Sequence, residues 1–378
     1  MTRQRVGILG STGSIGTTAL RVLARHPNRF EVTALTAFSN APLLREQARE
    51  FRPPFVGMVS EQEGGADEAW QCGVDCLVDA ATRDDVDIVL NAVVGAAGLD
   101  ATLAAVQAGK RVALANKESL VMAGALVDAA CAMGNGEIVP VDSEHSAILQ
   151  CISGRPAASI RRIVLTASGG PFRAWPAERL QHATITDALR HPTWTMGRKI
   201  TVDSATLANK ALEVIEAHFL FGIDYDRIDV VVHPQSVVHS FVEFVDGSVL
   251  AQLGVPSMEL PVLYSLTHPE RIADTGVPHF DPVELSPLTF EAVRGTDFPA
   301  LRLGTEAGRM GGAAPAVFNA ANEAAVALFL AGGIIFGDIA RAIASTLEAM
   351  GDADGSTRDA LLEADRRARH HVRNMFAC

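Results

Sequence analysis

Short apolar runs alternate with helical patterns of apolar residues in the N-terminal third of the chain. A strand-like run at 5–9 leads into a glycine-rich turn and then into a helical pattern at about 15–25. Further strand-like runs lie at 31–37, 55–59, 87–94 and 111–115, and helical patterns lie at 100–108 and from 117 to about 133. Because strands that alternate with helices usually form a parallel sheet covered on both faces, this part predicts a Rossmann-like α/β domain.

The pattern becomes less regular from about residue 147. Strands are predicted at 162–167 and between 233 and 253, a helix from Asp203 or Ser204 through Glu213, a proline-marked linker near 276–299, and helices at 315–330, at 337–350 and from Ser356. The predicted fold class is α/β. We expect an N-terminal Rossmann-like domain at 1–146, a central α+β domain at 147–275, a linker at 276–300, and a small helical C-terminal domain at 301–378.

Length, charge and cysteine content limit the classes of partner. The chain has 378 residues and a net charge of −12 with no long basic run, which argues against nucleic acid and requires a local positive site for any anionic substrate. The five cysteines are scattered and odd in number, which favours thiols in a reducing compartment. No apolar run is long enough to span a bilayer, and the N-terminal apolar run is too short for a signal peptide, so we expect a cytoplasmic protein without a membrane partner.

The glycine-rich turn reads GSTGSIG at 10–16 and stands between a strand and a helix. A dinucleotide site requires this order, because glycines let the backbone approach a pyrophosphate and the first helical turn presents N–H groups to it. The alternative is a tight turn that happens to be glycine-rich and binds no dinucleotide. The second strand ends in Ala37-Phe38-Ser39-Asn40 without a carboxylate, which permits NADP but does not demand it, since the nearest arginine is Arg45.

The segment VPVDSEH at 139–145 follows a strand-like run with two carboxylates. If the extended geometry continues, Asp142 and Glu144 point to the same side and suit a hard divalent cation such as Mg²⁺ or Mn²⁺. A solvated acidic turn is the alternative.

A second polar group is predicted on a helix. Asn209, Lys210 and Glu213 stand three and four positions apart and share one helical face. With Ser204 predicted near the N-terminus of the same helix, that face could hold a phosphate and lend a carboxylate to a metal.

Together the motifs resemble the 1-deoxy-D-xylulose 5-phosphate reductoisomerase family. The resemblance covers nearly the whole chain and rests on GSTGSIG at 10–16, ALANKESLV at 113–121, PVDSEH at 140–145, LTASGGPFR at 165–173, HPTWTMGRKITVDSATLANKALE at 191–213, HPQSVVHS at 233–240 and NAANEAAVALFL at 319–330. It implies isomerisation of the phosphorylated deoxy-sugar substrate and reduction by NADPH to 2-C-methyl-D-erythritol 4-phosphate. It also implies a divalent metal (Mg²⁺, Mn²⁺ or Co²⁺) and a homodimer. In this family resemblance the domain at 1–146 would bind NADPH, and the domain at 147–275 would be the catalytic, metal-binding and dimerisation domain with a flap loop near 188–199.

The resemblance also implies roles for individual residues. The metal ligands would be Asp142, Glu144 and Glu213, which with Lys117 form the catalytic group. The substrate would be bound by Lys117, Ser143, Glu144, Ser168, His191, Trp194, Met196, Ser204, Asn209, Lys210 and Glu213, with Trp194 and Met196 in the closing flap. The cofactor would be bound by Ser11, Thr12, Gly13, Ser14, Ile15, Asn40, Asn116, Lys117, Glu118 and Gly197. Phe38 and Ser39 depart from the family, which often has glycine and a basic residue there, so the preference for NADPH over NADH stays open.

Two other functions fit parts of the sequence. A semialdehyde or acyl-phosphate reductase shares the glycine turn but needs a thiolate nucleophile, and no cysteine stands at a convincing strand-to-helix turn. A non-catalytic nucleotide-binding regulator would bind cofactor without regard to metal. Within the favoured function, retro-aldol and concerted rearrangement stay open. His233 and His239 are assigned no chemistry, and the strands after His233 could pair with a second copy of the chain.

Overall fold

The computed structural model describes residues 3–60 and 69–377, which form two compact units. The first unit is built from the chain up to Ser119, from Ala125–Ser146 and from Ser257–Pro278. The second unit takes in Leu120–Gly124, Ala147–Pro256 and the chain from His279 onward. The segment 257–278 therefore packs with the first unit, whereas the predicted division into three domains and a linker remains a prediction.

The first unit contains a parallel sheet, as predicted. Its strand order in the described residues is β4-β3-β2-β1-β5-β6-β7, and every pairing is parallel. The strands are β1 (Gln4–Leu9), β2 (Phe30–Ala37), β3 (Phe55–Met58), β4 (Gln71–Cys72), β5 (Ile88–Asn91), β6 (Arg111–Leu114) and β7 (Glu137–Pro140). Successive strands are added on one side of β1 as far as β4 and on its other side from β5 onward, so the strand order reverses between β1 and β5. The crevice beyond the carboxyl ends of these two strands is the expected ligand position in such a sheet.

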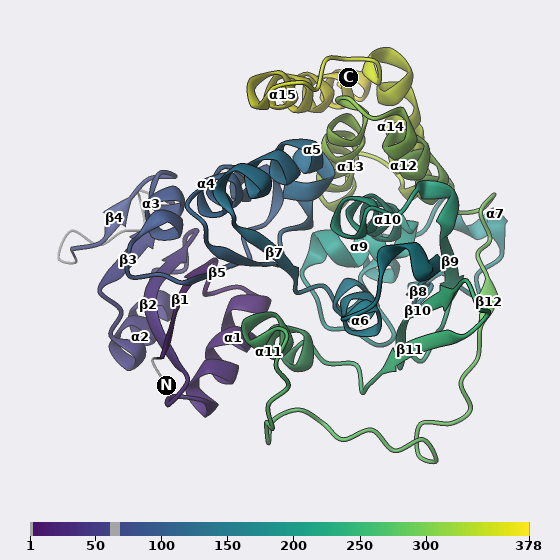
Figure 1. Ribbon diagram of the computed structural model, residues 1–378. Helices are drawn as coiled ribbons and strands as arrows, with labels where there is room; N and C mark the ends of the chain where they lie inside the picture. Colours follow the sequence, from purple (N-terminus) through teal and green to yellow (C-terminus); the bar gives the residue numbers. More distant parts are fainter. Residues whose placement is uncertain (1–2, 61–68, 378) are drawn as a thin grey trace. The chain divides into compact units, whose positions relative to one another are not determined.

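The helices of this unit cover an apolar sheet (Figure 1). They are α1 (Ser14–Arg25), α2 (Ala41–Phe51), α3 (Cys76–Thr82), the short η1 (Gly95–Gly98), α4 (Leu99–Gln107), α5 (Lys117–Gly134) and α11 (Glu259–Thr267). Helix α11 packs beside α1, and Arg25 of α1 forms ion pairs with Glu259 and Asp274. These ion pairs hold the segment 257–278 against α1.

The second unit contains a mixed sheet. Its order in the described residues is β11-β10-β8-β9-β12, where β8 and β9 are parallel and the other pairs antiparallel. The strands are β8 (Ile160–Ala167), β9 (Ile228–Val232), β10 (Val238–Phe244), β11 (Val249–Leu253) and β12 (Glu291–Ala292). The expectation of a strand from His233 is wrong for 233–237, since β9 ends at Val232 and Ser236 adopts a left-handed φ of 51° in a turn, whereas 238–239 lie in β10.

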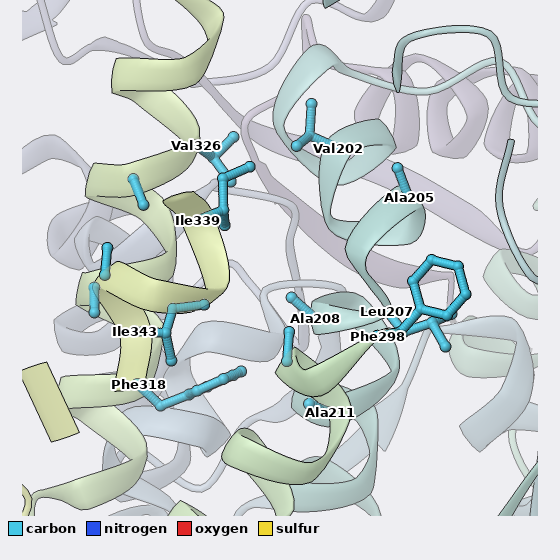
Figure 2. Packing of buried hydrophobic residues seen from close by; sticks show 14 of the residues in the cluster. Val202, Ala205, Leu207, Ala208, Ala211, Phe298, Phe318, Val326, Ile339 and Ile343 are labelled. Carbon is cyan, nitrogen blue, oxygen red and sulfur yellow. The ribbon is translucent and has the colours of Figure 1, made fainter. Parts of the chain in front are cut away.

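The helices of the second unit surround an apolar cluster in which many side chains are alanine. They are the C-terminal part of α6 (Ser143–Ile152), η2 (Ala157–Ser159), α7 (Ala177–Leu180), α8 (Ile185–Ala188), α9 (Arg198–Thr206), α10 (Ala208–Phe221), η3 (Tyr225–Arg227), α12 (Pro299–Met310), α13 (Ala314–Leu330), α14 (Phe336–Met350) and α15 (Arg358–Met375). Figure 2 shows Val202 and Ala208 in one cluster with Phe318 and Ile343. Small side chains let these helices approach closely.

Two details of the helical region differ from expectation. Helix α12 was not among the individually predicted helices, although nearly all of it lies in the domain at 301–378 that was expected to be helical. The last helix is capped by Thr357, whose side chain accepts a hydrogen bond from Ala360 N, and not by Ser356. Among residues 3–60 and 69–377, no helix combines the length and apolar character needed to cross a membrane.

Candidate active site

The glycine turn between β1 and α1 has the close backbone packing that its sequence predicts. Gly10 has φ +84°, and a Cβ on Gly16 would lie 2.4 Å from the Gly10 carbonyl oxygen. Gly13 caps α1, and Gly13 N donates to Gly10 O at 3.1 Å. Thr12, Gly13, Ser14 and Ile15 are exposed or half-buried at the carboxyl end of β1. Their amides are therefore accessible at the position where a pyrophosphate binds in such folds.

Ser11 differs from the other residues of this turn because it is fully buried. Its hydroxyl donates to Gln47 Oε1 at 2.7 Å, and Gln47 Nε2 donates to Ser11 O at 3.0 Å. Gln47 of α2 was not identified from the sequence. A polar residue on the buried face of the helical pattern at 41–51 is the signal that could have revealed it. Gln47 thus holds the turn in place.

The end of β2 presents the residues expected to choose the cofactor. Phe38 is 70% exposed, and Ser39 and Asn40 are also exposed. Asn40 caps α2 through a hydrogen bond from Leu43 N to its side-chain oxygen at 3.2 Å. No carboxylate stands at 38–40, so this end of the strand offers no charge against a 2′-phosphate.

Asn116, Lys117 and Glu118 follow β6 and begin α5, as predicted. Asn116 is buried, and its side-chain amide donates to Val93 O, Gly95 O and Glu118 Oε2 at 2.8, 2.9 and 3.1 Å. These bonds order the loop after β5. Asn116 therefore fixes the loop at residues 93–95, which follows β5 and borders the expected cofactor position.

The Lys117 ammonium contacts the Asp142 carboxylate, with Nζ to Oδ2 at 2.6 Å. The two residues are 25 positions apart and meet because β6 and β7 are adjacent parallel strands. Burial alone would raise the pKa of Asp142, but Lys117 and the nearby His145 outweigh it and hold that pKa well below its usual range. Asp142 is therefore ionised, as a metal ligand must be.

The predicted extension of the strand through Glu144 is wrong. β7 ends at Pro140 and α6 begins at Ser143, so strand alternation does not set the directions of the two carboxylates. They are neighbours for a different reason: Glu144 N donates to Asp142 Oδ1 at 3.3 Å, and Ser143 Oγ donates to Glu144 Oε2. A helix start also supplies N–H groups that favour negative charge.

In the second unit, α10 brings the predicted polar face together. Asn209 Nδ2 and Lys210 Nζ each donate to one oxygen of the Glu213 carboxylate. Lys210 and Glu213 are both buried. The group therefore contains one positive charge, one carboxylate and one amide on neighbouring turns.

Ser204 does not begin this helix, contrary to expectation. It lies in the last turn of the preceding helix α9, and Leu207, in a left-handed conformation with φ 61°, separates α9 from α10. Two helices meet here because the backbone turns at a single residue. Any role of Ser204 toward a phosphate thus comes from its side chain, since the N-terminus of α10 is not at Ser204.

Ser168 and His191 also meet, with Ser168 Oγ and His191 Nε2 at 2.9 Å. His191 Nδ1 accepts from the backbone N–H groups of Thr193 and Trp194 at 3.1 and 2.9 Å. Since Nδ1 is an acceptor, Nε2 carries the proton and donates to Ser168. Burial lowers the pKa of His191, which keeps the imidazole neutral. Gly169 and Gly170, with φ +81° and +64°, permit the adjoining turn.

The predicted flap is irregular from His191 to Gly197 and helical from Arg198. Trp194 and Met196 are half-buried, and Gly197 caps α9. Thr193 Oγ1 donates to Pro234 O at 3.4 Å, which links the loop to the turn after β9. Gly197 belongs to the second unit and the other cofactor residues to the first, so its contact with the cofactor stays a prediction.

A parallel sheet with this strand order and a glycine turn after its central strand is the architecture of dinucleotide-dependent oxidoreductases. The family model for 1-deoxy-D-xylulose 5-phosphate reductoisomerase matches residues 6–124, and two models of C-terminal domains of the same family match 138–221 and 253–371. The chain belongs to the 1-deoxy-D-xylulose 5-phosphate reductoisomerase family.

Individual relatives are similar over their whole length. The chain is 50% identical to the reductoisomerase of Gloeobacter violaceus, with 98% of this chain and 97% of the relative covered. It is 49% identical to that of Geobacter metallireducens, with 99% of each chain covered. The solved structure of the Zymomonas mobilis enzyme in complex with NADPH is 41% identical, with TM-score 0.92 and 99% of each chain covered. A second solved reductoisomerase, in complex with NADPH, fosmidomycin and magnesium, is 42% identical, with TM-score 0.91 and 98% of this chain and 97% of that chain covered.

Proposed function

We propose that this chain catalyses the divalent-metal-dependent isomerisation of 1-deoxy-D-xylulose 5-phosphate and the NADPH-dependent reduction of the resulting aldehyde to 2-C-methyl-D-erythritol 4-phosphate. Membership of the family over nearly the full chain carries the proposal. The glycine turn of the first unit and the phosphate-type group of the second supply the two binding chemistries that this reaction needs. The substrate is a sugar-like phosphate, as expected for a chain related to a fosmidomycin-binding enzyme.

NADPH supplies the hydride when bound, and residues of the first unit fit it. Thr12, Gly13, Ser14 and Ile15 would face the pyrophosphate with backbone amides, and Ser11 would fix their turn through Gln47. Asn40 would meet the adenosine end, while Asn116 and Glu118 would shape the nicotinamide end. Lys117, at the start of α5, would stand between cofactor and substrate, and Gly197 would approach the cofactor from the second unit.

A divalent cation fits the ionised oxygen donors of the acidic segment. We propose Asp142, Glu144 and Glu213 as its ligands, a set of hard oxygen donors that suits Mg²⁺, Mn²⁺ or Co²⁺. When bound, the cation polarises a carbonyl and acidifies a neighbouring hydroxyl of the substrate. Lys117 keeps Asp142 charged, and Lys210 donates a hydrogen bond to the Glu213 carboxylate. Relatives solved with magnesium support the choice of ion class.

The substrate phosphate would be held in the second unit by Ser168, Ser204, Asn209 and Lys210. Neutral His191 orients Ser168 by donating to its oxygen, which leaves the Ser168 hydroxyl proton to donate to a phosphate oxygen. Lys210 supplies the positive charge, which an anionic substrate needs on a chain of net charge −12. Ser143 and Lys117 would border the sugar, and Trp194 and Met196 would exclude water when the flap closes.

Finer properties belong to the same proposal. A homodimer is supported by the edge strand β11, which ends the second sheet and carries the exposed apolar side chains of Val249 and Leu250. NADPH is preferred to NADH despite the departure at Phe38 and Ser39, because no acidic residue stands at 38–40. The enzyme works in the cytoplasm, where NADPH and phosphorylated sugars are available.

The decisive experiment is an NADPH-oxidation assay with 1-deoxy-D-xylulose 5-phosphate, run with and without a chelator and repeated with NADH. We expect turnover that the chelator abolishes and that Mg²⁺ or Mn²⁺ restores, with lower activity on NADH. Absence of turnover with metal present would contradict the proposal. Alkylation of the thiols separates it from the thiolate-dependent reductases: burial raises the pKa of Cys76 to about 12, so this thiol is protonated, and we expect alkylation to leave turnover largely intact.

A further inference from the structure

A polar cluster with a buried centre joins α9 to the C-terminal helices α13 and α15 of the second unit. Asn322 Nδ2 of α13 donates to Asp203 Oδ1 of α9 at 2.8 Å. Lys199 Nζ, one turn earlier on α9, lies 2.9 Å from Asp203 Oδ2 and 3.7 Å from Glu323 Oε1. Arg369 of α15 donates to Glu323 Oε2 at 2.6 Å. We call Lys199, Asp203, Asn322, Glu323 and Arg369 the α9–α13 polar cluster.

Stability alone does not account for this cluster. Asp203 is 1% exposed and Asn322 is 0% exposed. Burying a charge costs several kcal/mol even when it is paired, and apolar residues of similar size often stabilise a core as well or better. The side-chain oxygen of Asn322 is buried without a hydrogen-bond partner among the described residues, so its amide is retained at a cost. Its side-chain nitrogen is committed to the hydrogen bond to Asp203.

The apolar surroundings explain why a polar link is useful. Helix α9 contacts α13, and Val202 and Ala205 of α9 belong to the same alanine-rich apolar cluster as Ala321 and Ala325 of α13. Small, smooth surfaces of this kind permit helices to slide or rotate by part of a turn. A buried polar pair admits one register, because any other leaves a charge without its partner.

The position of α9 matters because of what lies at its two ends. The flap segment 191–197 leads into its first turn, and Ser204 is the neighbour of Asp203 in its last turn. The backbone of Ser204 packs against Gly170, where an added Cβ would lie 2.6 Å from Ser204 O. A shift of α9 would therefore move the end of the flap and Ser204 together. The turn at Gly170 is already in close contact with the Ser204 backbone and could not accommodate that movement.

We propose that Asp203, held by Asn322 and Lys199, is a positioning residue that fixes α9 so that Ser204 and the flap meet the substrate phosphate. The C-terminal helices act on substrate binding through this contact, since Glu323 of α13 pairs with Lys199 and Arg369 of α15 holds Glu323. The inference rests on the proposed function, because it assigns the phosphate of that substrate to Ser204 and the flap.

A charge swap tests this role. Asn322→Asp places two carboxylates together, and we expect the KM for 1-deoxy-D-xylulose 5-phosphate to rise at least tenfold while the KM for NADPH changes less than twofold. Asp203→Asn with Asn322→Asp restores a donor–acceptor pair, and we expect it to return the substrate KM most of the way to the value of the parent protein.

Glu323→Gln, which leaves the Asp203–Asn322 bond intact, should raise the substrate KM about threefold. Glu363→Gln, in the exposed Arg366–Glu363 pair of α15, is the control and should change neither KM.

A binding measurement separates this inference from the proposed function. In a Trp70→Phe, Trp175→Phe background, Trp194 is the remaining tryptophan, and its fluorescence should respond to inorganic phosphate in the parent protein and tenfold more weakly in Asn322→Asp. Loss of turnover in the unaltered chain would defeat the proposed function while this phosphate response still tests the cluster. Variants that unfold at lower temperature but keep the substrate KM and the phosphate response would overturn the inference, as would a swap that fails to restore either.

Discussion

The two units each bury a lysine against a carboxylate, but they build the pair in different ways. In the first unit Lys117 and Asp142 are 25 positions apart and meet across the adjacent strands β6 and β7. In the second unit Lys210 and Glu213 are three positions apart on α10. The second pair needs only a helix, whereas the first needs a sheet with a particular strand order. The same kind of buried ion pair thus depends on sheet topology in the first unit and on local helical structure in the second.

The largest expected effect comes from neutralising either carboxylate. For Asp142→Asn and Glu213→Gln we expect kcat/KM to fall roughly 10³-fold, because loss of a charged oxygen ligand removes several kcal/mol of transition-state stabilisation. NADPH binding, measured by cofactor fluorescence, should be retained in Glu213→Gln. Normal turnover in either variant would refute the proposed metal site and would leave both pairs as structural salt bridges.

Truncating the lysines should separate the two pairs by kinetic parameter. We expect Lys210→Ala to raise the KM for the sugar phosphate about 10- to 100-fold, the loss typical of a hydrogen bond to a charged group, with the KM for NADPH unchanged. Lys117→Ala should instead lower kcat, since Lys117 is proposed to border the sugar and pairs with the proposed metal ligand Asp142. Steady-state kinetics with each substrate varied in turn check this, and equal effects of Lys210→Ala on both KM values would remove it from the phosphate site.

The pH dependence of substrate binding should report His191. Burial lowers its pKa below the ordinary value of 6.5, so the neutral form is favoured in the folded protein and its contribution to stability is present above 6.5. As pH falls below 6.5 and through the lowered pKa, protonation of Nδ1 opposes the two backbone N–H donors. We expect the substrate KM to rise in this range, and a His191→Gln variant to have a high KM that is less sensitive to pH. A wild-type KM that stays flat from pH 7.5 to 5 would contradict this role.

The smallest effect on catalysis is expected at Asp274, whose partners are Arg25, His26 and Gly276. Burial would raise its pKa, but hydrogen bonds from Gly276, His26 and Arg25 outweigh it and lower the pKa. The stability it provides is therefore present above the ordinary value of 3.8 and is lost as pH falls through the lowered pKa. Asp274→Asn should cost about 2 kcal/mol of unfolding free energy, typical of hydrogen bonds to a charged group. Denaturant unfolding measures this, and both KM values should stay unchanged; a changed KM would show that the segment 257–278 reaches the site.

Much of the first unit could be predicted because its signals are local. Each predicted strand from 5–9 to 111–115 corresponds to a strand of the sheet, since buried parallel strands are continuous apolar runs. The glycine turn was equally readable, because Gly10 and Gly16 satisfy backbone constraints that no other residue meets. The contact of Asn209 and Lys210 with Glu213 followed from helical spacing alone.

The misplaced boundaries have a common physical cause. The ends of β7 and β9 depend on pairing with distant strands, since the last bonds to those strands are from Val141 N to Leu114 O and from His233 N to Ala167 O. The break at Leu207 between α9 and α10 carries no glycine or proline to announce it. Apolar periodicity continues through such points, so the sequence predicts one helix where the structure has two.

By itself the sequence determined the elements that depend on neighbours along the chain: the apolar strands, the glycine turn and the polar face of α10, whose geometry follows from a repeat of two or 3.6 residues. Only the tertiary structure decided which distant side chains share a buried environment. The pairing of Lys117 with Asp142, of Ser11 with Gln47 and of Asp203 with Asn322 depends on strand order and helix register. These pairs form because a buried polar atom must find a partner wherever the packing of the whole chain places one.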